Sequence, residues 1–217
     1  MTDIFNEVDE EVRREQLKKL WERYGTYLVA VCVLIVVGVG AWRGYEWWRN
    51  QQAEKSGAAF EQAVELAEAG RAQQAEAAFA KLAADGTAGY RALAQLRQAA
   101  ALAPTDRAAA LKAYDEIAVD GGVSQVIRDL ATVRAGYLLV DSVPYSELLS
   151  RLEPLTAFDR TFRYSAREIL ALSAWKARDI AATRKWTDML MADPQTPSGA
   201  RSRAAVLSEL IAASNKG

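Results

Sequence analysis

The stretch AEAAFAKLAADG (residues 75–86) contains an alanine, a phenylalanine four residues later and a leucine three residues after that. On an α-helix these three positions lie on one face, because side chains three and four residues apart are neighbours. The Asp-Gly pair that closes the stretch is a turn signal. The stretch therefore predicts a helix that buries Ala75, Phe79 and Leu82 and ends near residue 85.

The same order of a small or aliphatic residue, a large residue and an aliphatic residue recurs in three more stretches. They are ALKAYDEIAVDG (110–121), LLSRLEPLTAFD (148–159) and ATRKWTDMLMAD (182–193). The residues predicted to be buried there are Ala110, Tyr114, Ile117, Leu148, Leu152, Leu155, Ala182, Trp186 and Met189. The large residues, starting from Phe79, are 35, 38 and 34 residues apart. A repeat of this length predicts stacked helix pairs, since one pair alone cannot bury its apolar face.

Residues 56–214 resemble a divergent tetratricopeptide-like solenoid. The region is rich in alanine and other good helix formers, and glycine or proline stands mainly at short breaks between the predicted helices. The resemblance implies an all-α fold with about four helix pairs, followed by a capping helix over residues 198–215. The alternative is an irregular helical domain in which the spacing is a coincidence.

An apolar run without any charged residue extends from Tyr24 to Trp42. A helix of this length spans roughly 28 Å, which is close to the hydrocarbon thickness of a bilayer. Aromatic residues flank both ends of the run, as is typical of the lipid headgroup regions. They are Trp21, Tyr24, Tyr27, Trp42, Tyr45, Trp47 and Trp48. We therefore predict a membrane span rather than a buried core helix.

The segment before the span argues against a cleavable signal peptide. Such a signal begins with a short basic region, whereas here about two dozen residues, many of them charged, precede the apolar run.

Five Lys and Arg residues precede the run closely and three follow it, which favours a cytoplasmic N-terminus. We expect a charged helical head (1–23), a retained anchor with its aromatic flanks (24–48) and an exported helical domain (49–217). The head is either a solvated extension or a docking helix for a partner.

The composition excludes several classes of chemistry. The chain has no histidine, its single cysteine is Cys32 inside the apolar run, and its formal net charge is −1. Zinc sites of the Cys/His type, Ser/His and Cys/His catalysis and disulfides are therefore excluded. The charge balance argues against nucleic-acid binding, and no phosphate-binding glycine motif is present. We expect a protein that is not an enzyme and that has neither a cofactor nor a metal site.

The N-terminal sequence carries a second resemblance. The stretches DIFNEVDEEVRREQLKKLWERYG (3–25) and AWRGYEWW (41–48), followed by an alanine-rich repeat region, resemble the bacterial YfgM-type family in its alphaproteobacterial form. That family is an ancillary subunit of the SecYEG translocon. The resemblance implies an inner-membrane protein with a periplasmic repeat domain. It also implies three partners, namely the translocon, a membrane-anchored periplasmic chaperone of the prolyl-isomerase type and exported polypeptides.

A solenoid of this kind is expected to bind an extended peptide or a partner domain on the concave face that the first helix of each pair lines. Candidate contact residues, chosen by their position on those helices, are Arg91, Gln95, Arg128, Arg134, Arg163, Arg167 and Trp175. A second hypothesis is a scaffold that assembles another envelope complex. A third hypothesis is that the protein is an enzyme, in which case replacing a single polar residue should abolish its function.

Overall fold

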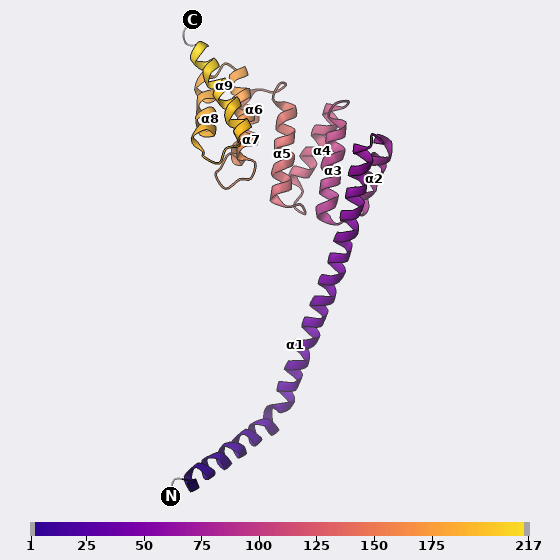
Figure 1. The fold of residues 1–217 in the computed structure, drawn as a ribbon, viewed down its shortest axis with the longest axis vertical. Helices are drawn as coiled ribbons and strands as arrows, with labels where there is room; N and C mark the ends of the chain where they lie inside the picture. The colour runs from indigo at the N-terminus through magenta and orange to yellow at the C-terminus, as the bar shows by residue number, and fades with distance from the viewer. Residues whose placement is uncertain (1–2, 215–217) are drawn as a thin grey trace. The chain divides into compact units, whose positions relative to one another are not determined.

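The computed structural model describes the backbone of residues 3–214 and the side chains of Lys18 and residues 21–213. Within residues 3–214 the regular secondary structure is entirely helical, which confirms the predicted all-α class. Figure 1 labels the α-helices in chain order. They are α1 (Asp3–Glu68), α2 (Ala72–Asp85), α3 (Ala88–Leu102), α4 (Arg107–Val119), α5 (Gln125–Leu139), α6 (Tyr145–Leu152), α7 (Arg163–Lys176), α8 (Ile180–Ala192) and α9 (Ser198–Ser214), and a short 3-10 helix, η1 (Glu153–Leu155), follows α6.

The chain divides into two compact units, residues 1–54 and residues 55–217. In the first unit, α1 includes a segment that is long and apolar enough to cross a membrane. Its large apolar side chains are exposed, with 70% of Leu34 and 71% of Val36 accessible, whereas a core helix of a soluble protein buries such residues. The backbone of residues 3–23 is helical. Most of its side chains lie outside the described residues, so a docking role for this head stays a prediction.

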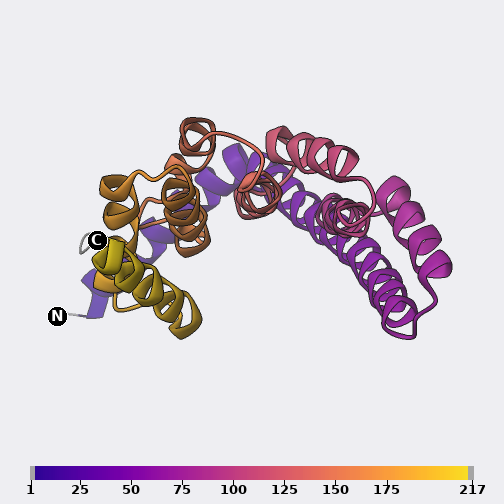
Figure 2. The ribbon, with the colours of Figure 1, turned by 90° about the horizontal axis from the view of Figure 1, so that it is seen from above.

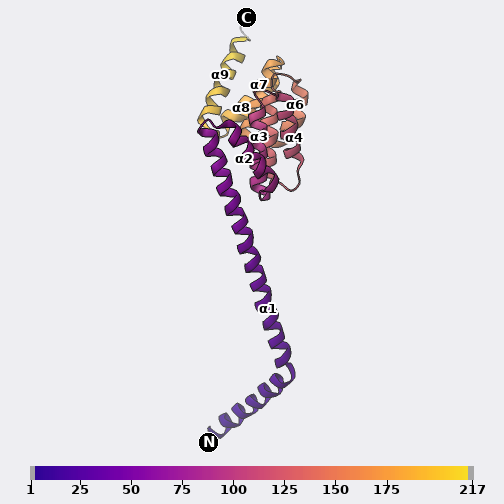
Figure 3. The ribbon, with the colours of Figure 1, turned by 90° about the vertical axis from the view of Figure 1, so that its right-hand side faces the viewer.

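In the second unit, successive helices pack against one another as pairs. The end of α1 pairs with α2, α3 with α4, α5 with α6, and α7 with α8, while α9 packs on α8. Further contacts join α3 to α5, α5 to α7 and α7 to α9. Figure 2 shows these four helices along one side of a curved row, and Figure 3 shows the same packing from another direction. The predicted four pairs with a capping helix are confirmed, and we call α3, α5, α7 and α9 the first-helix layer.

The buried apolar residues of the second unit form three clusters along the row. The first joins the end of α1 to α2 and α3 around Phe79, and Phe60 lies edge-on to that ring with centroids 5.7 Å apart. The second joins α3, α4 and α5 around Tyr114 and Ile117. The third is the largest and joins α5, α6, α7, α8 and α9 around Trp186. Each cluster thus lies between consecutive pairs, as the repeat pattern requires.

The residues predicted to be buried in the second helices are confirmed in three pairs. The buried residues are Ala75, Phe79 and Leu82 in α2, Ala110, Tyr114 and Ile117 in α4, and Leu148, Leu152 and Leu155 in α6 and η1. In each helix the three residues lie on one face, and that face packs against the neighbouring helices. The spacing of a small, a large and an aliphatic residue was therefore enough to find that face.

In α8 the prediction was wrong at two of three positions. Trp186 is buried, but Ala182 and Met189 are only half-buried, and their places are taken by Thr183 and Leu190. The face that α8 turns to α7 and α9 contains Thr183, Trp186, Thr187 and Leu190, so two of its buried positions lie one residue later than predicted. A threonine can be buried there because its hydroxyl donates to a carbonyl one turn earlier, as Thr183 Oγ1 does to Asp179 O at 2.7 Å.

Gly86, in the turn between α2 and α3, has no room for a side chain. Its N–H donates to the Leu82 carbonyl at 2.9 Å, and a Cβ at position 86 would lie 2.5 Å from that same oxygen. We expect Gly86→Ala to lower the free energy of unfolding by about 1–3 kcal/mol, as overpacking does elsewhere. Gly89→Ala is the matched control, because a Cβ there meets nothing within 4 Å. Urea unfolding of the full chain in detergent should separate the two, and equal stability would contradict the clash.

Candidate functional site

The first-helix layer presents two of the predicted contact residues to solvent. Arg91 on α3 is exposed, and its Nη2 donates to the Gly86 carbonyl at 3.2 Å. Arg134 on α5 is also exposed, and its charge acts on Tyr114 in α4. Burial raises the pKa of the Tyr114 hydroxyl, and the Arg134 guanidinium opposes that rise. Both arginine side chains are therefore accessible to a binding partner without any change in the fold.

Gln95 and Arg128 are half-buried and occupy different settings. Gln95 lines a cavity formed by α2, α3, α4 and the end of α1. Arg128 donates from Nη2 to the Gln125 side-chain oxygen at 2.5 Å and from Nη1 to the Asp120 carbonyl at 3.4 Å. Arg128 thus ties the start of α5 to the end of α4, so a substitution there would disturb the turn as well as any contact surface.

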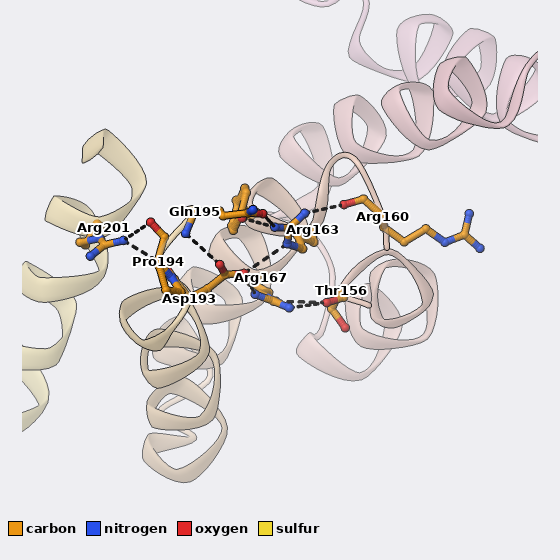
Figure 4. A network of polar contacts seen from close by, with 9 residues as sticks. Thr156, Arg160, Arg163, Arg167, Asp193, Pro194, Gln195 and Arg201 are labelled. Atoms are coloured by element: carbon orange, nitrogen blue, oxygen red, sulfur yellow. Dashed lines mark hydrogen bonds and ion pairs between the residues drawn. The ribbon is translucent and has the colours of Figure 1, made fainter. Parts of the chain in front are cut away.

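Arg163 and Arg167 lie in a buried polar network between α7 and the loop after α8 (Figure 4). Their side chains reach the same carboxylate oxygen, Asp193 Oδ2, at 3.2 Å from Arg163 Nε and 3.4 Å from Arg167 Nη1. Arg167 also donates twice to the Thr156 carbonyl, at 3.1 and 2.8 Å. The accessible fractions of the two arginines are 8% and 5%, which leaves little surface for a partner. Their observed contacts hold the last repeats together.

The Asp193 carboxylate is kept ionised by this network. Burial by itself would raise its pKa, but hydrogen bonds from the Gln195 backbone N–H and from Arg163, together with the charge of Arg163, hold the pKa below its ordinary value. Arg163 Nη2 further donates to the Gln195 side chain at 2.8 Å, and Arg201 of α9 donates to the carbonyls of Asp193 and Pro194. The network therefore connects α7, the loop after α8 and α9.

Trp175, the last predicted contact residue, is half-buried on α7 and packs against the third cluster. The structure thus brings together Arg163 and Arg167 through Asp193, and distributes the other predicted residues over α3, α5 and α7. No group of three His, Cys, Asp or Glu residues able to hold a metal ion is found in the described part of the chain.

Residue-by-residue reasoning missed an exposed apolar row on the first-helix layer. Tyr137 on α5 and Leu172 on α7 each expose 42% of their surface, and Val206 on α9 exposes 57%. They are spaced 35 and 34 residues apart, close to the repeat length, and this spacing was the signal that could have found them. The Glu168 carboxylate raises the pKa of Arg203, and Tyr137 contributes in the same direction. Arg203 on α9 donates from Nη2 to Glu168 Oε2 on α7 at 2.9 Å, so side chains of these two helices of the layer are in contact.

Comparison with protein families now identifies the architecture. A family model described as a tetratricopeptide repeat-like domain matches residues 18–170. The chain belongs to the tetratricopeptide repeat-like domain family. The match begins within α1 and ends inside α7, so α8 and α9 extend the repeat-like packing beyond the matched residues. Tetratricopeptide repeat-like domains are typically non-catalytic scaffolds for protein–protein interaction, which fits an exposed row of apolar and cationic side chains. Searches of curated proteins and of solved structures found no significant match.

Proposed function

We propose that this chain is a non-enzymatic binding protein of the bacterial inner membrane and an ancillary subunit of the Sec translocon. The observation that carries the proposal is the presence, in one chain, of a helix able to cross a membrane and a tetratricopeptide repeat-like domain. Its N-terminal sequence and the residues after the span resemble the YfgM-type family, which supplies the translocon and the prolyl-isomerase-type chaperone as the partners to test.

The proposed orientation has the N-terminus in the cytoplasm and residues 49–217 in the periplasm. It rests on the excess of Lys and Arg before the span. In that arrangement the repeat-like domain is tethered near the channel exit. Tethering raises the effective concentration of a binding surface around an emerging chain, so weak contacts suffice for capture.

The proposed contact surface is the exposed side of the first-helix layer. Of the residues chosen by their position in the sequence, this surface keeps the exposed Arg91 and Arg134. It also includes the exposed apolar residues Tyr137, Leu172 and Val206. Tyrosine and arginine are, with tryptophan, the residues enriched among those that dominate binding energy at protein interfaces, and the leucine and valine add apolar area. An unfolded exported polypeptide offers both apolar side chains and carboxylates to such a surface.

The test combines topology with site-specific photo-crosslinking in cells. A reporter enzyme that works only in the periplasm, fused after Lys216, should show activity if residues 49–217 are exported. A crosslinker in place of a residue from Val31 to Val39 should capture translocon subunits or the chaperone. A crosslinker at Tyr137 should capture exported polypeptides, and one at Val119, which is 82% exposed on the second helix α4, should capture far fewer.

Each part has an outcome that contradicts the proposal. Activity of a cytoplasmic reporter alone would exclude the exported domain. Capture of other envelope proteins, without translocon subunits or chaperone, would instead support the scaffold for another complex. Equal capture at Tyr137 and Val119 would show that the first-helix layer is not the contact surface.

A further inference from the structure

A cavity of about 1120 Å³ lies between the first two helix pairs, away from the Tyr137–Leu172 row. It is bordered by the end of α1 and by α2, α3 and α4, and both α2 and α4 pack on α3. Cavities that bind small ligands usually have volumes of about 300–1,000 Å³, so this one has room for several side chains of a peptide. Its size follows from composition, because many of its lining residues are alanines.

The lining of the cavity is mixed, with apolar residues beside residues that carry hydrogen-bonding side chains. Phe79 and Ile117, which belong to the first and second apolar clusters, line it together with Leu102, which is 38% exposed. Gln95 and Gln98, whose side chains end in amides, are also among the lining residues. An amide can both donate to and accept from a peptide backbone, so the lining suits an apolar peptide segment rather than a purely ionic ligand.

The charge of the lining is strongly unbalanced. Four carboxylates, those of Glu68, Glu76, Glu116 and Asp120, border the cavity, and Arg97 is the single cationic residue among its lining residues. Glu116 lies 3.9 Å from Lys112, but both side chains are mostly exposed and such pairs are weak. Glu68 and Glu76 have no ion-pair partner among the described residues. The cavity therefore attracts cations and repels anionic lipid headgroups and nucleic acids.

We propose that this cavity binds a segment of a partner protein in which Lys or Arg alternates with apolar residues. The apolar side chains enter between α2 and α4, and the cationic groups meet the carboxylates of Glu76 and Glu116. The cavity is lined by residues other than the Tyr137–Leu172 row, and its proposed ligand does not depend on the translocon assignment. The cavity proposal and the proposed function can therefore be disproved independently.

The experiment uses the full chain in discs of zwitterionic lipid and a fluorescent peptide in which lysines alternate with leucines. Its fluorescence anisotropy should rise on binding and fall with salt. Glu76→Lys with Glu116→Lys should weaken binding by about tenfold or more, since attraction becomes repulsion. The matched control, Glu61→Lys with Glu209→Lys, makes the same charge change at exposed positions outside the cavity and should have little effect.

A second pair of variants tests the cavity itself without changing charge. Ala72 lines the cavity and is exposed, so Ala72→Trp should fill it and weaken binding by about tenfold, whereas Ala84→Trp, exposed on the same helix outside the cavity, should not. Circular dichroism checks that all variants fold. The proposal is overturned if cavity and control variants bind alike, or if a glutamate–leucine peptide binds as tightly. It is also overturned if ultracentrifugation shows that Glu76→Lys with Glu116→Lys dissociates a dimer, because the occupant is then a second copy.

Discussion

Replacing Trp186 with alanine is expected to lower the free energy of unfolding by about 3–5 kcal/mol, the usual cost of removing a large buried aromatic side chain. Trp186 is 1% exposed and is the largest fully buried side chain among the described residues. It belongs to the cluster that joins α5 to α9, and its Nε1 donates to the Tyr145 hydroxyl at 2.9 Å. The truncation thus removes apolar contacts from several helices and one hydrogen bond.

The measurement is urea unfolding of the full chain in detergent, followed by far-ultraviolet circular dichroism. Trp186→Phe keeps much of the apolar contact but loses the donor to Tyr145, so a smaller loss of roughly 1 kcal/mol is expected. Val119→Ala is the control for apolar truncation at an exposed site and should change stability little. A Trp186→Ala chain as stable as the Val119→Ala chain would contradict the packing described for α8.

Arg163→Met should cost about 3 kcal/mol at neutral pH, because it removes the nearer of two cationic partners of the buried Asp193 carboxylate and leaves only the longer contact to Arg167. The variant loses the contacts of Arg163 with Asp193 and Gln195 and its position over the Phe158 ring, 4.9 Å from the centroid. Arg184→Met is the matched control, since Arg184 is exposed on α8. A chain that unfolds like the control but loses partner binding would reverse this assignment and make Arg163 a contact residue.

The stability difference between wild type and Arg163→Met should also depend on pH, in a direction that the pKa of Asp193 sets. The folded-state pKa of Asp193 lies below its ordinary value of 3.8, so its stabilising contribution is fully present above that pH and is lost as the pH falls through the lowered pKa. Without Arg163, the pKa of the Asp193 carboxyl moves upward, because burial is then less opposed. The difference in melting temperature between wild type and Arg163→Met should therefore be largest near neutral pH and narrow in acid below pH 3.8. A constant difference across this range would contradict the coupling.

The fold was largely predictable because its pattern is local. A ring such as Phe79 or Tyr114, with a small residue one turn before and an aliphatic residue one turn after, defines a buried face within a single helix. The turn after α2 was predictable for the same reason, since the Asp-Gly pair at residues 85 and 86 is itself a local turn signal and α2 ends at Asp85. In α8 the pattern identified Trp186 but placed the other two buried positions one residue too early, because the exact rotation of a helix against its neighbours is set by tertiary packing.

The candidate site was less predictable because exposure is set by tertiary packing. Arginines are usually exposed, and nothing near Arg163 in the sequence indicates that Asp193, 30 residues later, lies beside it. Conversely, Tyr137 and Leu172 are residue types common in cores, and although their spacing follows the repeat, their exposure is set by the packing of α5 and α7. The cavity between the first two pairs depends on the distance between helices, which no single segment encodes.

The division of the apolar residues into three clusters along the row has a consequence for cooperativity. Each cluster joins only neighbouring helices of the row, and half-buried Leu111 packs against both the second and the third cluster and so links these two. Such an array behaves as a chain of coupled segments and not as one all-or-none unit. Amide hydrogen exchange should therefore give α5 to α9, which share the third cluster, a different protection from α2 and the start of α3, which share the first.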